Sequence, residues 1–301
     1  MDSIRVHAPT SVVLLCGGPL DVKSPTPTSL REAFTRVAQK SSFPKHTSLL
    51  PEQLDAFFPR GGYRDILTFE SDIAQISDLI ILFTESFGSA AELGAFAISP
   101  EIAPRLLVFI DDYYYGHDSF IKLGPIRSLE NDYGDAAICV LDRHDINISR
   151  IENIAGLNIS IFAERIIAAF SARIKQTRSR TTFNRTSPGH IIKFTVGLIQ
   201  HYGALTLDEI DVFLYSLEIR IPLNRLSDML LCAEFAGWIL KEKFGINNYY
   251  IAKSENQALQ YKLREECQHI DKLRWKTDIR DYWMHNDPER FNAITKNILR
   301  R

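Results

Sequence analysis

Residues 79–97 read LIILFTESFGSAAELGAFA, and this stretch decides the fold. Five apolar residues, 79–83, come first, which is typical of a strand buried on both faces of a parallel sheet. A polar turn, 84–88, follows them. The alanine-rich segment 89–97 predicts a helix whose N-cap is Ser89. Together these segments predict a strand, a turn and a helix, the repeating unit of an α/β protein.

The same alternation continues on both sides of this stretch. Helices are expected from residue 29, with Ser29 and Glu32 at the spacing of a capping box, and over 67–77. Strands are expected over 11–16, 106–110 and 136–141. This order predicts a Rossmann-like α/β domain, with a parallel sheet and helices on both of its faces.

Composition narrows the class of protein. The chain has 301 residues and a net charge of −2. Four widely spaced cysteines, without a C-x-x-C pair, indicate neither a zinc knuckle nor a disulfide framework. The histidines show no metal-ligand spacing, so we expect no metal and no cofactor. Without a signal peptide or a membrane-spanning run, the sequence predicts a cytoplasmic protein that does not contact a membrane.

The second half predicts a different, mostly helical domain. After a helix expected over 158–175, the segment 176–189 carries proline, serine, threonine and arginine but no acidic residue. We interpret it as a basic linker between a domain at 1–175 and a domain at 190–301. Helices followed by a β-hairpin at 238–252 predict a winged helix-turn-helix.

Three arginines of the linker, Arg178, Arg180 and Arg185, are candidates for binding nucleic-acid phosphates. A solvated linker beside a winged helix that docks onto protein explains the same residues about as well. From the sequence both alternatives stay open.

Four acidic residues fall on consecutive predicted elements: Glu70, Asp78, Glu85 and Glu92. Cleavage of an N-glycosidic bond passes through an oxocarbenium-like state and uses positioned carboxylates. Some of these residues could meet at the sheet edge where open α/β folds bind ligands. However, Ser89 and Glu92 have the spacing of a capping box, and spacing alone favours that structural role for Glu92.

Four features together resemble the nucleoside deoxyribosyltransferase family. They are the strand ending Leu15-Cys16-Gly17-Gly18, the acid Glu70 placed before Asp78, the run from Glu85 to Phe96, and the stretch from Ser119 to Arg127. The chain is still more similar to effectors encoded beside retron reverse transcriptases, which join such a domain to a winged helix. The C-terminal half matches only in its predicted architecture.

The resemblance implies roles for particular residues. Glu92 stands where the family has its nucleophile, and Glu70 falls near an upstream acid that contacts the substrate. The pocket for the sugar or a phosphate is then lined by Gly17, Gly18, Asp78, Ser86, Gly88 and Ser89. Ser86 replaces the aspartate that commonly recognises the base, and the first strand has no obvious tyrosine, so a nucleotide or NAD fits better than a free nucleoside.

The function that follows is that of a toxic effector in a retron anti-phage system. We expect it to cleave NAD or a related nucleotide, to act as an oligomer, and to be restrained by the retron reverse transcriptase and its msDNA, a hybrid of RNA and DNA. Two alternatives stay open: a DNA-binding regulator that senses a nucleotide, and a deoxyribosyltransferase of nucleotide salvage.

Overall fold

The structure is a computed structural model that describes residues 4–21, 23–40, 43–53, 63–177, 181–254, 256–262 and 271–299. The chain divides into two compact units, and both are built from separate segments. The sheet unit comprises Ser11–Gln53 and Ser77–Arg178. The helical unit comprises Met1–Thr10, Leu54–Ile76 and Ser179–Arg301. The units therefore combine segments that the expected boundaries at 175 and 190 would keep apart.

The sheet unit contains five parallel strands in the order β3-β2-β4-β5-β6. Their bounds are β2 Val12–Cys16, β3 Thr47–Leu49, β4 Leu79–Phe83, β5 Leu106–Asp111 and β6 Ile138–Leu141. Leu15 pairs with Ile81, and Leu82 pairs with Val108. The predicted α/β class and its parallel sheet are confirmed, and β3 is an additional edge strand.

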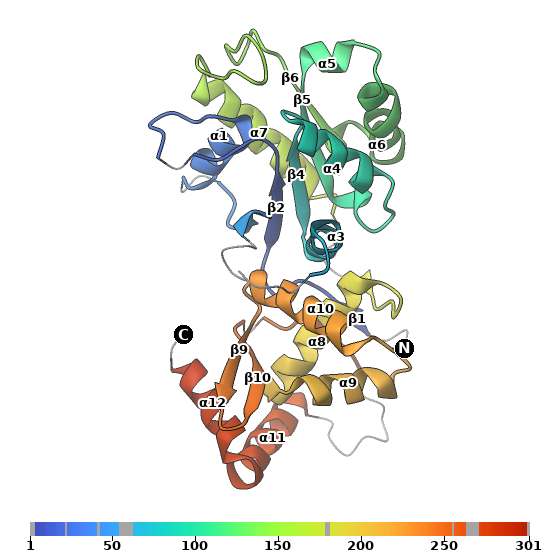
Figure 1. Cartoon of the computed structure of the whole chain (residues 1–301), viewed down its shortest axis with the longest axis vertical. Coiled ribbons are helices and arrows are strands. Elements are labelled where there is room, and N and C mark those ends of the chain that lie inside the picture. The colour runs from blue at the N-terminus through green and yellow to red at the C-terminus, as the bar shows by residue number, and fades with distance from the viewer. Residues whose placement is uncertain are drawn as a thin grey trace. The chain divides into compact units, whose positions relative to one another are not determined.

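Side chains alternate between the two faces of this sheet, as the pleat requires. Leu15, Ile81 and Phe109 belong to a buried cluster with Phe34 of α1 (Leu30–Ala38) and Phe162 of α7 (Ile159–Ile174). Figure 1 shows α1 and α7 on one side of the strands and α4 (Phe87–Ala97) on the other. Helices therefore cover both faces of the sheet, as the sequence predicts.

Shorter elements complete the sheet unit. They are α5 Asp112–Gly116, α6 Arg127–Tyr133, the 3₁₀ turns Ala103–Arg105 and Asp135–Ala137, and a π-helical segment at Lys122–Ile126. Arg173 at the end of α7 is buried and donates to the carbonyls of Leu106 (2.7 Å) and Pro104 (2.9 Å). This buried arginine thus holds α7 against the start of β5.

The helical unit surrounds a small antiparallel sheet of order β8-β10-β9. Its larger elements are α3 Ile66–Ile76, α8 Pro188–Tyr202, β8 Ala204–Leu205, α9 Leu207–Ser216, α10 Leu223–Phe235, β9 Ile239–Phe244, β10 Asn247–Ala252, α11 Lys272–Asn286 and α12 Pro288–Ile298. The predicted hairpin is confirmed as β9 and β10. The capping box of Thr206 and Glu209 also forms at the start of α9.

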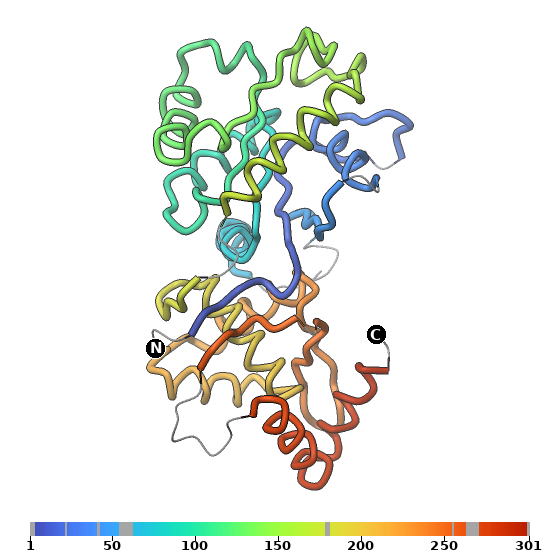
Figure 2. Tube along the Cα trace, turned by 180° about the vertical axis from the view of Figure 1, so that it is seen from behind, coloured from blue at the N-terminus to red at the C-terminus, as the bar shows by residue number. Residues whose placement is uncertain are grey.

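A second, three-stranded sheet in this unit joins distant parts of the chain. β1 (Arg5–Val6) pairs with both β7 (Thr181–Thr182) and β11 (Leu259–Gln260). Figure 2 lets the reader follow the N-terminal trace beside these later segments. The part of the expected linker that the structure describes from residue 181 onward is therefore folded. Across the described ranges, we find no helix with the length and apolar character needed to span a bilayer.

Candidate functional site

The sheet reverses its strand order at β2. From β2 the chain passes through α1 to β3 on one side, whereas β4 pairs with the other side of β2. Open α/β sheets bind ligands outside the carboxyl ends of the strands at such a switch point. Cys16 is the last residue of β2, and the chain leaving β4 enters α4, which carries Glu92. The topology thus directs attention to Cys16 and Glu92.

Helix α4 begins earlier than the sequence predicts. Its N-cap is Ser86, whose hydroxyl accepts from the Ser89 N–H at 3.1 Å, and the Ser89 hydroxyl accepts from the Ser86 N–H at 3.1 Å. The predicted N-cap at Ser89 is wrong, because the two serines form the capping box with each other. Glu92 lies in the second turn of the helix, so its carboxylate is not needed to cap the backbone.

The Glu92 carboxylate is half-buried and only partly engaged. Its Oε2 atom is buried and has no hydrogen-bond partner within the described residues. Burial raises the pKa of Glu92, and the nearby Glu52 raises it further, whereas a hydrogen bond from the Cys16 thiol and the charge of Arg31 lower it. An unsatisfied buried carboxylate oxygen is costly, and groups of this kind cluster at functional sites.

Arg31 and Glu52 join this site, although no motif in the sequence points to either of them. Arg31 lies in the first turn of α1, where its buried guanidinium forms an ion pair with Glu52 and donates to the Leu15 carbonyl at 3.4 Å. A single arginine in the first turn of a helix is a weak signal in a sequence. Its long-range partners come from segments that only the fold brings together.

Glu85 has a structural role beside the site. Its carboxylate accepts three backbone N–H bonds, from Gly18 at 2.8 Å, Leu30 at 2.7 Å and Arg31 at 3.0 Å. Burial raises the pKa of Glu85, while these three bonds and the charge of Arg31 oppose the shift. The side chain ties the end of β4 to the turn after β2 and to the start of α1.

This arrangement explains the glycine pair. A Cβ atom on Gly18 would lie 2.9 Å from Cδ of Glu85 and 2.9 Å from Cβ of Ser29. Gly17 adopts a φ of +153° and is similarly enclosed by Arg31 and Glu85. The sequence predicts that the Gly18 N–H binds a phosphate. In the structure this N–H donates to the Glu85 carboxylate instead.

The first turn of α4 provides other donors. The N–H groups of Phe87 and Gly88 are at positions where a helix has no acceptor of its own, and both residues are exposed. Together with the Ser86 hydroxyl, they lie on the element that carries Glu92. The Ser86 hydroxyl is bonded to Ser89. Unlike the Gly18 N–H, the N–H groups of Phe87 and Gly88 are at positions where helix N-termini bind anions.

Two of the predicted site residues lie elsewhere. Asp78 precedes β4 and donates its N–H to the Val12 carbonyl at 2.8 Å. Burial lowers the pKa of Arg105, and the charge of Asp78 opposes this shift. Asp78 therefore lies at the amino edge of the sheet, opposite the edge of Glu92. Glu70 is buried on α3 and belongs to the helical unit. Its action beside Glu92 stays a prediction.

The predicted contacts with nucleic acid are not resolved by the structure. Arg185 is exposed and forms a 2.6 Å ion pair with Glu218, whereas Arg178 and Arg180 lie outside the described residues. Over the ranges that the structure covers, there is no group of three or more His, Cys, Asp or Glu side chains that could hold a metal ion.

Comparison with known proteins identifies the family. Residues 27–241 match the STM3845 retron effector protein family, and the matched range includes Arg31, Glu85 and Glu92. The chain belongs to this retron effector family. The predicted resemblance to retron effectors is therefore confirmed.

Two curated relatives come from Escherichia coli. The Retron Ec73 and Retron Ec86 proteins are each named "putative ribosyltransferase/DNA-binding protein". This retron effector is 35% identical to the first over 65 residues, which are 22% of its own chain and 21% of the relative. It is 35% identical to the second over 118 residues, 39% and 36% of the two chains. The matched segments thus span about a fifth and about a third of these relatives.

Proposed function

We propose that this retron effector cleaves the N-glycosidic bond of NAD or a related nucleotide, with Glu92 as the catalytic carboxylate. The observation that carries the proposal is the buried, uncommitted Oε2 of Glu92 on the helix that follows β4, at the switch point of the sheet. The ribosyltransferase in the names of the two relatives supports the same class of chemistry.

In the proposed reaction, a Glu92 oxygen attacks the anomeric carbon as the bond from that carbon to the base nitrogen breaks. The electron pair of that bond leaves with the base. In NAD the nicotinamide nitrogen is cationic, so nicotinamide departs as a neutral molecule and needs no proton. Water then attacks the anomeric carbon, releases Glu92 and gives its proton to solvent. The products are ADP-ribose and nicotinamide.

The surroundings of Glu92 support this step. The nucleophile must be ionised, and its raised pKa makes ionisation the event that limits activity at low pH. The Cys16 thiol and the Arg31 guanidinium favour the charged form, while burial keeps the carboxylate poorly solvated and reactive. We therefore expect cleavage to increase with pH above the ordinary glutamate pKa of 4.5.

The substrate is proposed to carry a phosphate. The first turn of α4 offers the N–H groups of Phe87 and Gly88, and the Ser86 hydroxyl would join them by exchanging its bond to Ser89 for one to the phosphate. These donors lie within two turns of Glu92 on one helix, which suits a sugar phosphate whose anomeric carbon lies over the carboxylate. A free nucleoside would leave them unused.

A release assay tests the proposal. Purified protein is incubated with NAD, nucleotides and deoxynucleosides, and free base is measured by chromatography. Glu92→Gln should lower base release by about 10³-fold or more, because it removes the nucleophile. Glu164→Gln, the same change at an exposed position of α7, is the matched control. Equal rates for the two variants would reject Glu92 as the nucleophile.

Glu70 is proposed to orient or protonate the leaving base. A proton is needed by a base that leaves from a neutral nucleotide, but not by nicotinamide. Glu70→Gln should therefore slow purine release more than nicotinamide release. If both rates fall equally, Glu70 is important only for folding or binding.

We further propose that the retron reverse transcriptase and its msDNA restrain this activity. The order α8-β8-α9-α10-β9-β10 and the antiparallel sheet support a winged helix, and the relatives' names include DNA binding. Arg178, Arg180 and Arg185 are the proposed phosphate contacts.

Adding the reverse transcriptase with msDNA should suppress base release. The affinity should fall with rising salt, and less steeply in an Arg185→Gln variant. An affinity that does not depend on salt would reject these contacts.

A further inference from the structure

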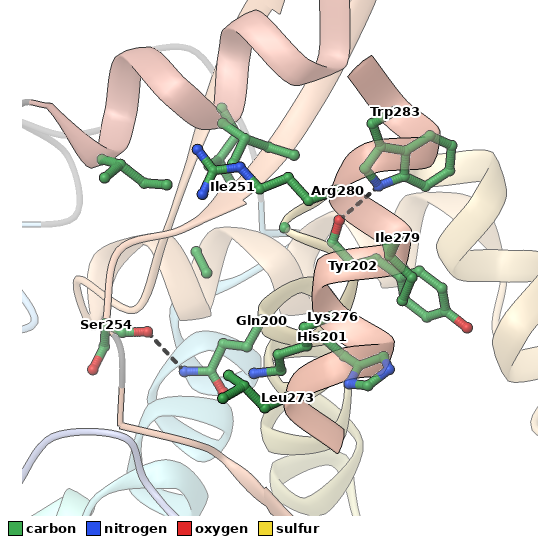
Figure 3. A pocket seen from close by; sticks show the side chains of 14 residues that line it. Gln200, His201, Tyr202, Ile251, Ser254, Leu273, Lys276, Ile279, Arg280 and Trp283 are labelled. Atoms are coloured by element: carbon green, nitrogen blue, oxygen red, sulfur yellow. Dashed lines mark hydrogen bonds between the residues drawn. The ribbon is translucent and has the colours of Figure 1, made fainter. Parts of the chain in front are cut away.

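The helical unit contains a cavity of about 520 Å³ that the proposed reaction does not use. It lies among the end of α8, strand β10 and helices α11 and α12, and Figure 3 shows its walls. The residues lining it are Gln200, His201, Tyr202, Gly203, Ile251, Ala252, Ser254, Leu273, Lys276, Ile279, Arg280, Trp283, Ile294 and Ile298. Its volume is within the range of pockets for small molecules.

The charged side chains among the described residues of the wall are all basic. Lys276 and Arg280 are four residues apart on α11, and the side chains of both line the cavity (Figure 3). No acidic residue is among the described residues that line the cavity. Within the described part of the chain, no ion pair involves Lys276 or Arg280. Two cations without an acidic partner among the described residues provide an attachment point for an anion.

His201 adds a polar atom without a partner. Its Nε2 is buried and has no hydrogen-bond partner in the described residues, whereas its Nδ1 lies 3.4 Å from the Tyr261 hydroxyl. Burial, and then the charges of Lys276 and Lys272, lower the pKa of His201 to about 4. The ring is therefore neutral at pH 7 and adds no charge to the wall of the cavity.

Two further polar side chains of the wall, Gln200 and Trp283, are already hydrogen-bonded. The Gln200 amide donates to the Ser254 carbonyl at 3.0 Å, and its oxygen accepts from the Ala258 N–H at 2.7 Å. The Trp283 indole donates to the Tyr202 carbonyl at 3.0 Å, which fixes its ring. The wall of the cavity also has an apolar surface, which is formed by the Trp283 indole and by aliphatic side chains such as Ile251 and Ile294.

We propose that this cavity binds a small organic anion, with a phosphate or carboxylate group held by Lys276 and Arg280 and an apolar body packed against Trp283. This is a second ligand site, in the unit that does not contain Glu92. The two cations select an anionic ligand. An organic anion is favoured over an inorganic ion, because only the organic anion has an apolar body that can contact the apolar wall.

Titration calorimetry on the full chain tests the site with four probes. Phenyl phosphate and benzoate carry both features, benzyl alcohol lacks the charge, and inorganic phosphate lacks the apolar body. We expect phenyl phosphate or benzoate to bind at least tenfold more tightly than the other two. Their relative affinities distinguish a phosphate ligand from a carboxylate ligand. Equal binding of benzyl alcohol, or no binding of any probe, would overturn the proposal.

Variants locate the binding. Lys276→Gln and Arg280→Gln should each weaken the aromatic anion at least tenfold, whereas Lys243→Gln, at an exposed position of β9, should not. Ile298→Trp should also abolish binding, because it fills the cavity without changing its charge. Thermal unfolding checks that each variant is folded. Unchanged affinity in the folded Lys276 and Arg280 variants would refute the site.

Discussion

The backbone N–H of Gly18 donates a 2.8 Å hydrogen bond to Oε1 of Glu85, which lies 67 residues later in the chain. This bond fastens the turn after β2 to the end of β4. It forms the support on which Cys16 and Arg31 approach Glu92. The Glu85 carboxylate thereby occupies the N-terminus of α1, a place where other α/β folds hold a phosphate.

Glu85→Gln should destabilise the sheet unit. An amide offers one acceptor oxygen, so at least one of the donors, such as the Leu30 N–H, would face an NH₂ group. A buried donor that loses its partner costs about 1–3 kcal/mol. Denaturant unfolding should show this loss, and Glu164→Gln should change stability by less than about 0.5 kcal/mol. Equal stability of the two variants would contradict the bracing role.

Glu92→Gln should have the opposite effect on stability. Because the pKa of Glu92 is raised in the folded protein, the folded state holds the proton more tightly than the unfolded chain. Stability is therefore lost as pH rises above the ordinary value of 4.5. At pH 7 the variant should melt at the same or a higher temperature than the wild type, and the advantage should disappear at pH 4. The pKa shift would be disproved if the stability of the variant, compared with that of the wild type at the same pH, were lower at pH 7 than at pH 4.

Glu32 should make the protein sensitive to acid. Burial alone would raise its pKa, but hydrogen bonds from Thr28, Arg36 and the Asp21 N–H lower it from 4.5 to about 2. A depressed carboxyl pKa stabilises the fold above pH 4.5, and this contribution is lost as pH falls toward 2. The shift corresponds to roughly 3 kcal/mol. Unfolding measured between pH 2 and 6 should show a shallower pH dependence for Glu32→Gln. Parallel curves for the two proteins would exclude this role.

The helical unit should depend on Asp72 of α3. Asp72 is buried, and it receives two bonds from Arg225 of α10, at 2.5 and 2.6 Å, and one from the Tyr63 hydroxyl at 2.8 Å. Breaking a buried ion pair from one side typically costs 3–5 kcal/mol. Asp72→Asn should therefore lower stability by about this amount, while Asp281→Asn, exposed on α11, should be nearly neutral. A loss below about 1 kcal/mol for Asp72→Asn would show that solvent replaces the pair.

Local patterns predicted the sheet well. Each apolar run that ends in a polar turn, such as Leu79–Phe83, is a strand in the structure. The short strand β3 was missed, because three residues of mixed polarity give no periodic signal. The capping box at Ser29 is half right: Ser29 accepts from the Glu32 N–H, but the Glu32 carboxylate binds Thr28. Local spacing did not reveal this competition between two possible partners.

The candidate site was less predictable. Spacing alone predicts that Glu92 caps its own helix, because Ser89 precedes it by three residues. In the structure Ser86 and Ser89 form the capping box with each other, so Glu92 is not needed for capping. Arg31 and Glu52 reach Glu92 through the fold and not through any motif. Asp78 precedes a parallel strand, so its position in the sequence already assigns it to the opposite edge of the sheet.

The division of the chain has a consequence for synthesis on the ribosome. The chain passes between its compact units after residues 10, 53, 76 and 178. All segments of the sheet unit have been translated once the ribosome passes residue 178. Helix α3 belongs to the helical unit and packs against α8, which is translated much later. For example, Lys193 of α8 donates to the Gln75 carbonyl of α3, 118 positions away. The half of the protein that carries Glu92 can therefore fold during translation before α3 has met its partners, so an incomplete nascent chain already contains Glu92 together with Cys16, Arg31 and Glu52.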